Sequence, residues 1–288
     1  MARLAAFLDY QFSTRVSIAS YHQLPGIAPD WLSQPTTVLL ALAFHLAVYG
    51  PLLAAIIAAW LETGKDSLAE LWRQISRWRV DRRWYLAIVG IAVILVGLPI
   101  GLGALAGLVR LDTVGFLDFL PTLILIFIIQ VLTSGLGEEP GWRGFLLPRL
   151  QTRFSGEKPI WILGLVWAIW HYPLTIYYTL PQLAGAPSFV GVLMVISALA
   201  GQTMTLLGIT FLYVWLYNHT RSLFVAILFH ALSNTLTAIP FGEMQPVITL
   251  FVAIMPCVVV VVLGKMLPKG EFPGSPTHVT NKAGEAYR

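Results

Sequence analysis

Seven long apolar segments constrain this chain more than any other feature of its sequence. They run over about Thr36–Leu61, Trp84–Val109, Phe116–Thr133, Pro159–Leu180, Ser188–Tyr217, Ser222–Ile239 and Pro246–Met266. Each is close to the roughly 20 apolar residues that a helix needs to cross a bilayer. Only 11% of the residues are charged, against about 25% in soluble domains. The sequence therefore predicts an all-α, polytopic transmembrane helix bundle of about 7–8 transmembrane helices, and it excludes a water-soluble enzyme or a nucleic-acid binder.

The segments also divide the chain into regions. The fifth segment, Ser188–Tyr217, is about 30 residues long, so it is either one tilted helix or two helices that break near Gly201. We expect an N-terminal interfacial segment over residues 1–35, transmembrane helices over 36–115, a core over 116–240, a last transmembrane helix over 241–267 and a disordered tail over 268–288.

The distribution of Lys and Arg predicts the orientation of the chain in the membrane. With seven crossings, fifteen of the eighteen positive residues fall on one side, and only Arg3, Arg15 and Arg110 fall on the other. Positive residues concentrate on the cytoplasmic side of membrane proteins. We therefore expect an integral protein of the cell (plasma) membrane, with its C-terminus in the cytoplasm and its N-terminus outside.

Ionisable side chains at membrane depth are costly and usually face the bundle interior, so the few present here indicate a site. The first group is the run Gly137-Glu138-Glu139-Pro140-Gly141-Trp142-Arg143. Gly137 loosens the end of the third apolar segment, and Pro140 suits the first turn of a new helix, so we expect a helix break at the two carboxylates. Arg143 can pair with Glu139 across one helical turn. The alternative is a solvated acidic turn.

Two further groups lie inside apolar segments. His171 lies about 18 Å from the start of its helix at 1.5 Å per residue, and Trp167, one turn earlier, can pack on its imidazole. His230 and Asn234 are four residues apart, so they share one helix face. The alternatives are a hydrogen-bonded structural histidine at 171 and a helix–helix clamp at 230 and 234.

Together these residues suit amide hydrolysis by an activated water molecule. A glutamate can serve as the general base, and a histidine can orient the same water. A second histidine and an amide can stabilise the oxyanion of a tetrahedral intermediate. The His-Glu-x-x-His zinc motif and the Gly-x-Gly-Asp pair are absent from the sequence, and Leu132-Thr133-Ser134-Gly135 lacks the first glycine of Gly-x-Ser-Gly.

In their order and spacing the three groups resemble the CPBP family, the CAAX protease and bacteriocin-processing (ABI) group also described as type II CAAX prenyl endopeptidase-like. The resemblance spans roughly residues 116–240. It implies an all-α membrane bundle in which Glu138 and His171 activate water while His230 and Asn234 form the oxyanion hole. Glu139 and Arg143 match the rest of the first motif and are expected to give structural support. Trp167 stands where the second motif usually has Phe, a change of aromatic ring that we expect to be tolerated.

The resemblance leaves the cofactor and the activity open. Glu138, His171 and His230 are an acceptable zinc ligand set with water in the fourth position, but the same residues can also act without metal. The expected partners are membrane lipid and a peptide or membrane-protein substrate. The reaction expected is cleavage of a peptide bond near the cytosolic membrane boundary. The competing interpretation is a non-catalytic bacteriocin-immunity or membrane-scaffold protein of the same family.

Overall fold

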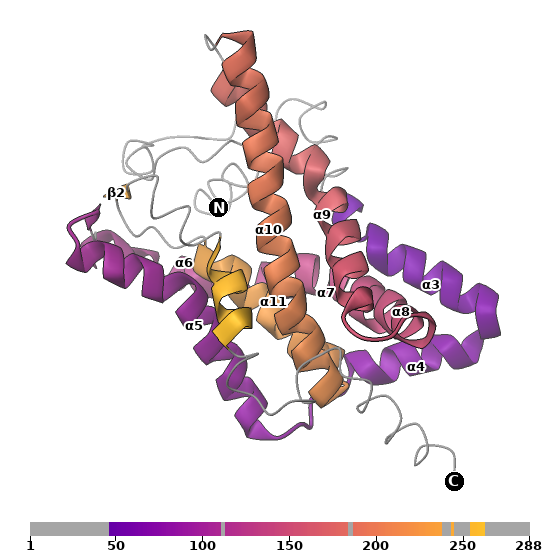
Figure 1. The fold of residues 1–288 in the computed structure, drawn as a ribbon. Coiled ribbons are helices and arrows are strands. Elements are labelled where there is room, and N and C mark those ends of the chain that lie inside the picture. Colours follow the sequence, from indigo (N-terminus) through magenta and orange to yellow (C-terminus); the bar gives the residue numbers. More distant parts are fainter. Residues whose placement is uncertain (1–45, 111–112, 184–186, 238–242, 245–253, 263–288) are drawn as a thin grey trace, which may run out of the picture.

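The computed structural model describes residues 46–110, 113–183, 187–237, 243–244 and 254–262. This part of the chain is almost entirely helical (Figure 1), which confirms the all-α prediction. A two-residue antiparallel pairing of β1 (Val109–Arg110) with β2 (Glu243–Met244) is the exception. The expected N-terminal interfacial segment, the C-terminal tail and most of the seventh apolar segment lie outside the described residues.

The first three described helices are set by local signals in the sequence. The helix α3 (Gly50–Thr63) has Pro51 in its first turn and ends at Gly64, whose φ of 64° lets the chain reverse into α4 (Lys65–Ile75). The helix α5 (Arg82–Leu105) begins where the Asp81 side chain accepts a hydrogen bond from the Arg83 backbone N–H at 3.0 Å.

The third apolar segment does not end where the sequence predicts. The helix α6 (Thr113–Gln130) continues through the π-helical turn η3 (Val131–Gly135), α7 (Leu136–Glu139), the π-helical η4 (Pro140–Leu146) and α8 (Leu147–Arg153). Glu139 keeps helical angles, with φ −61° and ψ −38°, so the predicted helix break before Pro140 is wrong. The wider turns of η3 and η4 accommodate the proline, which lacks an N–H and crowds the preceding turn.

The C-terminal half of the described chain is built from three helices. The helix α9 (Lys158–Thr179), followed by the short 3-10 helix η5 (Leu180–Leu183), packs along α10 (Ser188–Thr220). Helix α10 is unbroken through Gly201, so the segment from 188 is one helix and not two. It ends at Arg221, which has a left-handed φ of 50°, and α11 (Leu223–Thr237) returns into the bundle against α5 and α6. Residues 254–262 are also helical.

Four helical stretches of the described chain are long and apolar enough to cross a membrane. They are Arg82–Leu105, Phe119–Arg153, Lys158–Tyr177 and Ser188–Thr220, with Gly50–Thr63 and Leu223–Thr237 as shorter apolar helices. The protein is therefore an integral membrane helix bundle, and many apolar side chains on the outer faces of these helices are exposed in the isolated chain, as a lipid-facing surface requires.

Three basic segments meet at one end of this bundle. The Arg149 guanidinium donates to Glu62 at 2.7 Å, and Gln151 donates to Asn218 at 3.2 Å. Ser222 donates to the Arg77 carbonyl at 2.6 Å. The parts of the three basic segments around Arg77, Arg149 and Ser222 therefore share one end, as the charge distribution predicts. The side of the membrane that this end faces stays a prediction.

Candidate active site

The two carboxylates of the first motif lie in the interior of the bundle. Glu138 is 5% exposed and Glu139 is 0% exposed. They lie about eleven residues, roughly 16 Å of helix, before Arg149 at the basic end. This burial rules out the solvated acidic turn. Gly137 does not loosen the helix as predicted. It allows close packing, because a Cβ there would lie 2.7 Å from the Val48 carbonyl oxygen.

Glu139 is the anchor of a buried ionic network. Its Oε1 accepts a hydrogen bond from the Arg143 guanidinium at 3.1 Å, so the predicted pair one turn apart is present. The same oxygen lies 2.8 Å from His230 Nδ1. The Arg143 guanidinium carbon also lies over the rings of Trp167 and Tyr213, at 4.2 and 4.1 Å from their centroids. Two aromatic faces and one carboxylate therefore hold this cation in the core.

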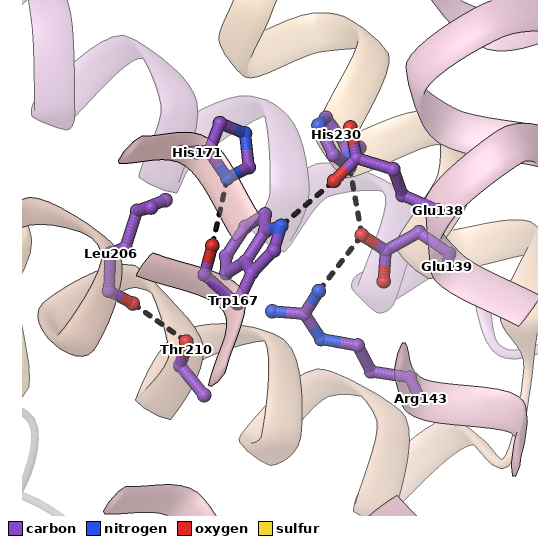
Figure 2. A network of polar contacts seen from close by, with 8 residues as sticks. All are labelled: Glu138, Glu139, Arg143, Trp167, His171, Leu206, Thr210 and His230. Atoms are coloured by element: carbon purple, nitrogen blue, oxygen red, sulfur yellow. Dashed lines mark hydrogen bonds and ion pairs between the residues drawn. The ribbon is translucent and has the colours of Figure 1, made fainter. Parts of the chain in front are cut away.

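Glu138 has a different partner. The indole N–H of Trp167 donates to its Oε2 at 2.7 Å (Figure 2). Glu138 Oε1 makes no hydrogen bond within the described part of the chain. Trp167 comes from the middle of α9 and is 2% exposed, so a helix distant in the sequence fixes one oxygen of this carboxylate and leaves the other available.

The two histidines lie against the same indole. The His171 ring meets Trp167 edge-on at 5.6 Å, as the sequence predicts, and the His230 ring does so at 5.8 Å. His171 Nδ1 lies 2.9 Å from the Trp167 carbonyl oxygen, which can only accept, so Nδ1 carries the proton. In the neutral ring, the Nε2 atom of His171 then has a lone pair for a water molecule. The Nδ1 atom of His230 likewise faces an acceptor, Glu139.

Asn234 is held one helical turn beyond His230. Its Nδ2 donates to Gln130 Oε1 at 3.1 Å, at the junction of α6 and η3. Gln130 is buried. Within the described part of the chain, Asn234 makes no direct hydrogen bond to Glu138, His171 or His230. The structure therefore brings Glu138, His171 and His230 together around Trp167, and it places Asn234 beside them on α11.

The arrangement does not fit the zinc ligand set considered above. Within the described ranges, no three His, Cys, Asp or Glu side chains gather closely enough to hold a metal ion. The contacts of Glu138 Oε2 and of the Nδ1 atoms of His171 and His230 do not decide this point, because they leave the other Glu138 oxygen and both Nε2 atoms uncommitted. We therefore derive no chemical step through a metal.

Sequence reasoning missed three contributions to the site. Tyr213 shares the Arg143 cation with Trp167, and a buried tyrosine in an apolar helix gives no signal without the tertiary contacts. Gln130, a polar side chain at membrane depth, is predicted to bond to another helix and does so, but the sequence does not identify its partner, Asn234. The indole N–H of Trp167 gives no signal of its own, because packing on the imidazole already accounts for an aromatic side chain one turn before His171.

Comparison with known proteins finds matches to CAAX proteases. Residues 120–236 match the family model of the Rce1-like type II CAAX prenyl endopeptidases. A curated relative, CAAX prenyl protease 2 of Methanococcus maripaludis, is 31% identical over 119 residues, which cover 41% of this chain and 40% of the relative. The chain is therefore aligned to well under half the length of that relative. The matched range contains all of the site residues described above.

Proposed function

We propose that this chain, whose residues 120–236 match the model of the Rce1-like type II CAAX prenyl endopeptidases, is an intramembrane endopeptidase that cleaves a peptide bond near the cytosolic membrane boundary. The observation that carries the proposal is the convergence of Glu138, His171 and His230 on one buried indole, that of Trp167. A carboxylate with a free oxygen and an imidazole with a free Nε2 are the two groups needed to hold and deprotonate a water molecule.

The first step follows from the free atoms of these groups. Oε1 of Glu138 takes one proton of the water, and Nε2 of His171 accepts a hydrogen bond from its other O–H. The water oxygen then bonds to the carbonyl carbon, and the electron pair of the C=O bond moves to the carbonyl oxygen. When the tetrahedral intermediate collapses, the C–N bond breaks and Glu138 returns its proton to the leaving amine.

The oxyanion is assigned to His230 and Asn234. Because Nδ1 of His230 faces a carboxylate that is also paired with Arg143, Nδ1 carries a proton. Nε2 can then donate to the oxyanion only when the ring carries a second proton. One side-chain N–H of Asn234 donates to Gln130, and the second N–H can donate to the oxyanion. Glu139 and Arg143 thus act on the reaction through His230.

The experiment uses the full chain in liposomes with a panel of membrane-tethered peptides, including peptides with prenylated and unprenylated C-terminal ends. Mass spectrometry in H₂¹⁸O should find one ¹⁸O atom in each new carboxylate. Glu138→Gln should lower the rate by about 10²–10⁴, the typical contribution of a general base, and the protein should remain folded. The matched control is Glu157→Gln, which changes an exposed glutamate at the start of α9. Equal rates for Glu138→Gln and wild type would refute the assignment.

Two arms of the experiment address the alternatives left open by the sequence. Loss of cleavage with a chelator, and its restoration by zinc, would replace the metal-free mechanism by a zinc mechanism. If the wild type cleaves no peptide and Glu138→Ala still supports the cellular phenotype of the wild-type gene, the protein is a non-catalytic immunity or scaffold protein.

A further inference from the structure

The indole of Trp167 lies between the two oppositely charged parts of the site. Its N–H points at Glu138 Oε2, at 2.7 Å, while its ring face receives the Arg143 guanidinium at 4.2 Å. The rings of His171 and His230 pack against the same indole. A side chain in contact with all four groups has little freedom to turn, so the direction of its N–H is fixed by the packing around it (Figure 2).

The two neighbouring glutamates are held in different ways. Glu139 is held by the cation Arg143, with both side chains fully buried. Glu138 is held by a neutral donor, the Trp167 N–H. A neutral donor fixes the position of a carboxylate without placing a full positive charge beside it.

We propose that Trp167 is a positioning residue for the general base: its N–H fixes Oε2 of Glu138 so that Oε1 faces the attacking water. This inference rests on the proposed function. It also revises the expectation that exchange between Trp and Phe at this position is tolerated, because a phenyl ring can pack on His171 but has no N–H for Glu138.

The test removes the N–H of Trp167 in two variants, one of which keeps the shape of the double ring. Trp167 is replaced by Phe and, in a second protein, by benzothienylalanine, whose sulfur takes the place of the indole N–H. The matched control is Trp161→Phe. Trp161 lies on the same helix and also donates to a glutamate, Glu157, at 3.4 Å, but at an exposed position away from the site.

Steady-state cleavage of one tethered peptide is measured for each protein, together with the temperature of unfolding. We expect kcat to fall about tenfold or more in both Trp167 variants, as the loss of a hydrogen bond to a charged group predicts. KM should change less than about twofold, because the bond acts on the base and not on the substrate. The benzothienylalanine protein should remain folded at the assay temperature, although the unpaired Glu138 oxygen lowers its unfolding temperature, and Trp161→Phe should keep the wild-type kcat.

Wild-type kcat in the benzothienylalanine protein would overturn the inference, and so would a loss of kcat that is fully accounted for by unfolded protein at the assay temperature. A separate arm does not depend on turnover: the indole ¹H–¹⁵N resonance of Trp167 should move in Glu138→Ala and stay unchanged in Glu157→Ala. A resonance unaffected by Glu138→Ala would also overturn the inference. If the wild type cleaves nothing while the resonance moves, the proposed function is wrong, and Trp167 positions Glu138 for another purpose.

Discussion

Replacing Gly141 by alanine tests the packing that holds the first motif against α3. A Cβ at this position would lie 2.4 Å from the Pro51 carbonyl oxygen and 2.6 Å from the Pro51 carbonyl carbon. Ordinary van der Waals contact begins at 3.4 Å, so the helices would have to separate by about 1 Å. The obstructing atoms belong to the backbone and cannot turn away as a side chain can. We therefore expect Gly141→Ala to lower the free energy of unfolding by about 1–3 kcal/mol, as overpacking of a core does.

The matched controls are Gly90→Ala and Gly101→Ala. Both glycines lie on exposed positions of α5, and an added Cβ at either meets nothing within 4 Å. All three changes give the same gain in intrinsic helix propensity, about 0.5–1 kcal/mol, so that gain cancels when the variants are compared. We expect Gly141→Ala to be about 1–3 kcal/mol less stable than the controls.

Thermal unfolding of the three variants in one detergent measures this difference. We expect Gly141→Ala to unfold several degrees below the controls. It should also lose activity, because Gly141 lies between Glu139 and Arg143 and any shift of η4 moves both. Equal unfolding temperatures for Gly141→Ala and Gly90→Ala would show that α3 does not pack on η4 as described.

Three further predictions concern the ionic network, the oxyanion and the topology. Arg143→Met should destabilise the protein by about 3–5 kcal/mol, because it leaves Glu139 buried without its cation; adding Glu139→Gln should recover part of the stability in the same unfolding assay. Asn234→Ala should lower kcat about 10²–10³-fold. Gln130→Leu should lower kcat less, because it only releases the Asn234 side-chain amide from its hydrogen bond. Wild-type kcat in Asn234→Asp at neutral pH would exclude the oxyanion role. A reporter fused after Lys269 should be cytosolic and one at the N-terminus external; reporters on the same side would contradict an odd number of crossings.

The helical fold was predictable because its signals are local. Long apolar segments act within one helix, although the sequence left open whether residues 188–217 form one helix or two, and α10 is one. The pair of Glu139 with Arg143 and the packing of Trp167 on His171 were predictable for the same reason, since one helical turn brings the partners together.

The contacts that were missed join elements far apart in the sequence. The Trp167 N–H reaches Glu138 across 29 positions, and Gln130 reaches Asn234 across 104. The error at Pro140 has a different cause. Proline normally disfavours helical geometry in the residue before it. The wider π-helical turns on either side of α7 relieve the steric clash of Pro140 with the preceding turn. No residue pattern in the sequence predicts such turns.

The uninterrupted helix explains how adjacent glutamates have different environments. Successive residues of a helix point about 100° apart at 3.6 residues per turn. Glu138 thus faces Trp167 of α9, and Glu139 faces His230 of α11 and Arg143 on the following turn. A helix break at Pro140 would have left Arg143 without a fixed position one turn after Glu139. The π-helical turns keep the helix intact at Pro140. They therefore allow Glu138 to keep one free oxygen while Glu139 is bound in an ion pair.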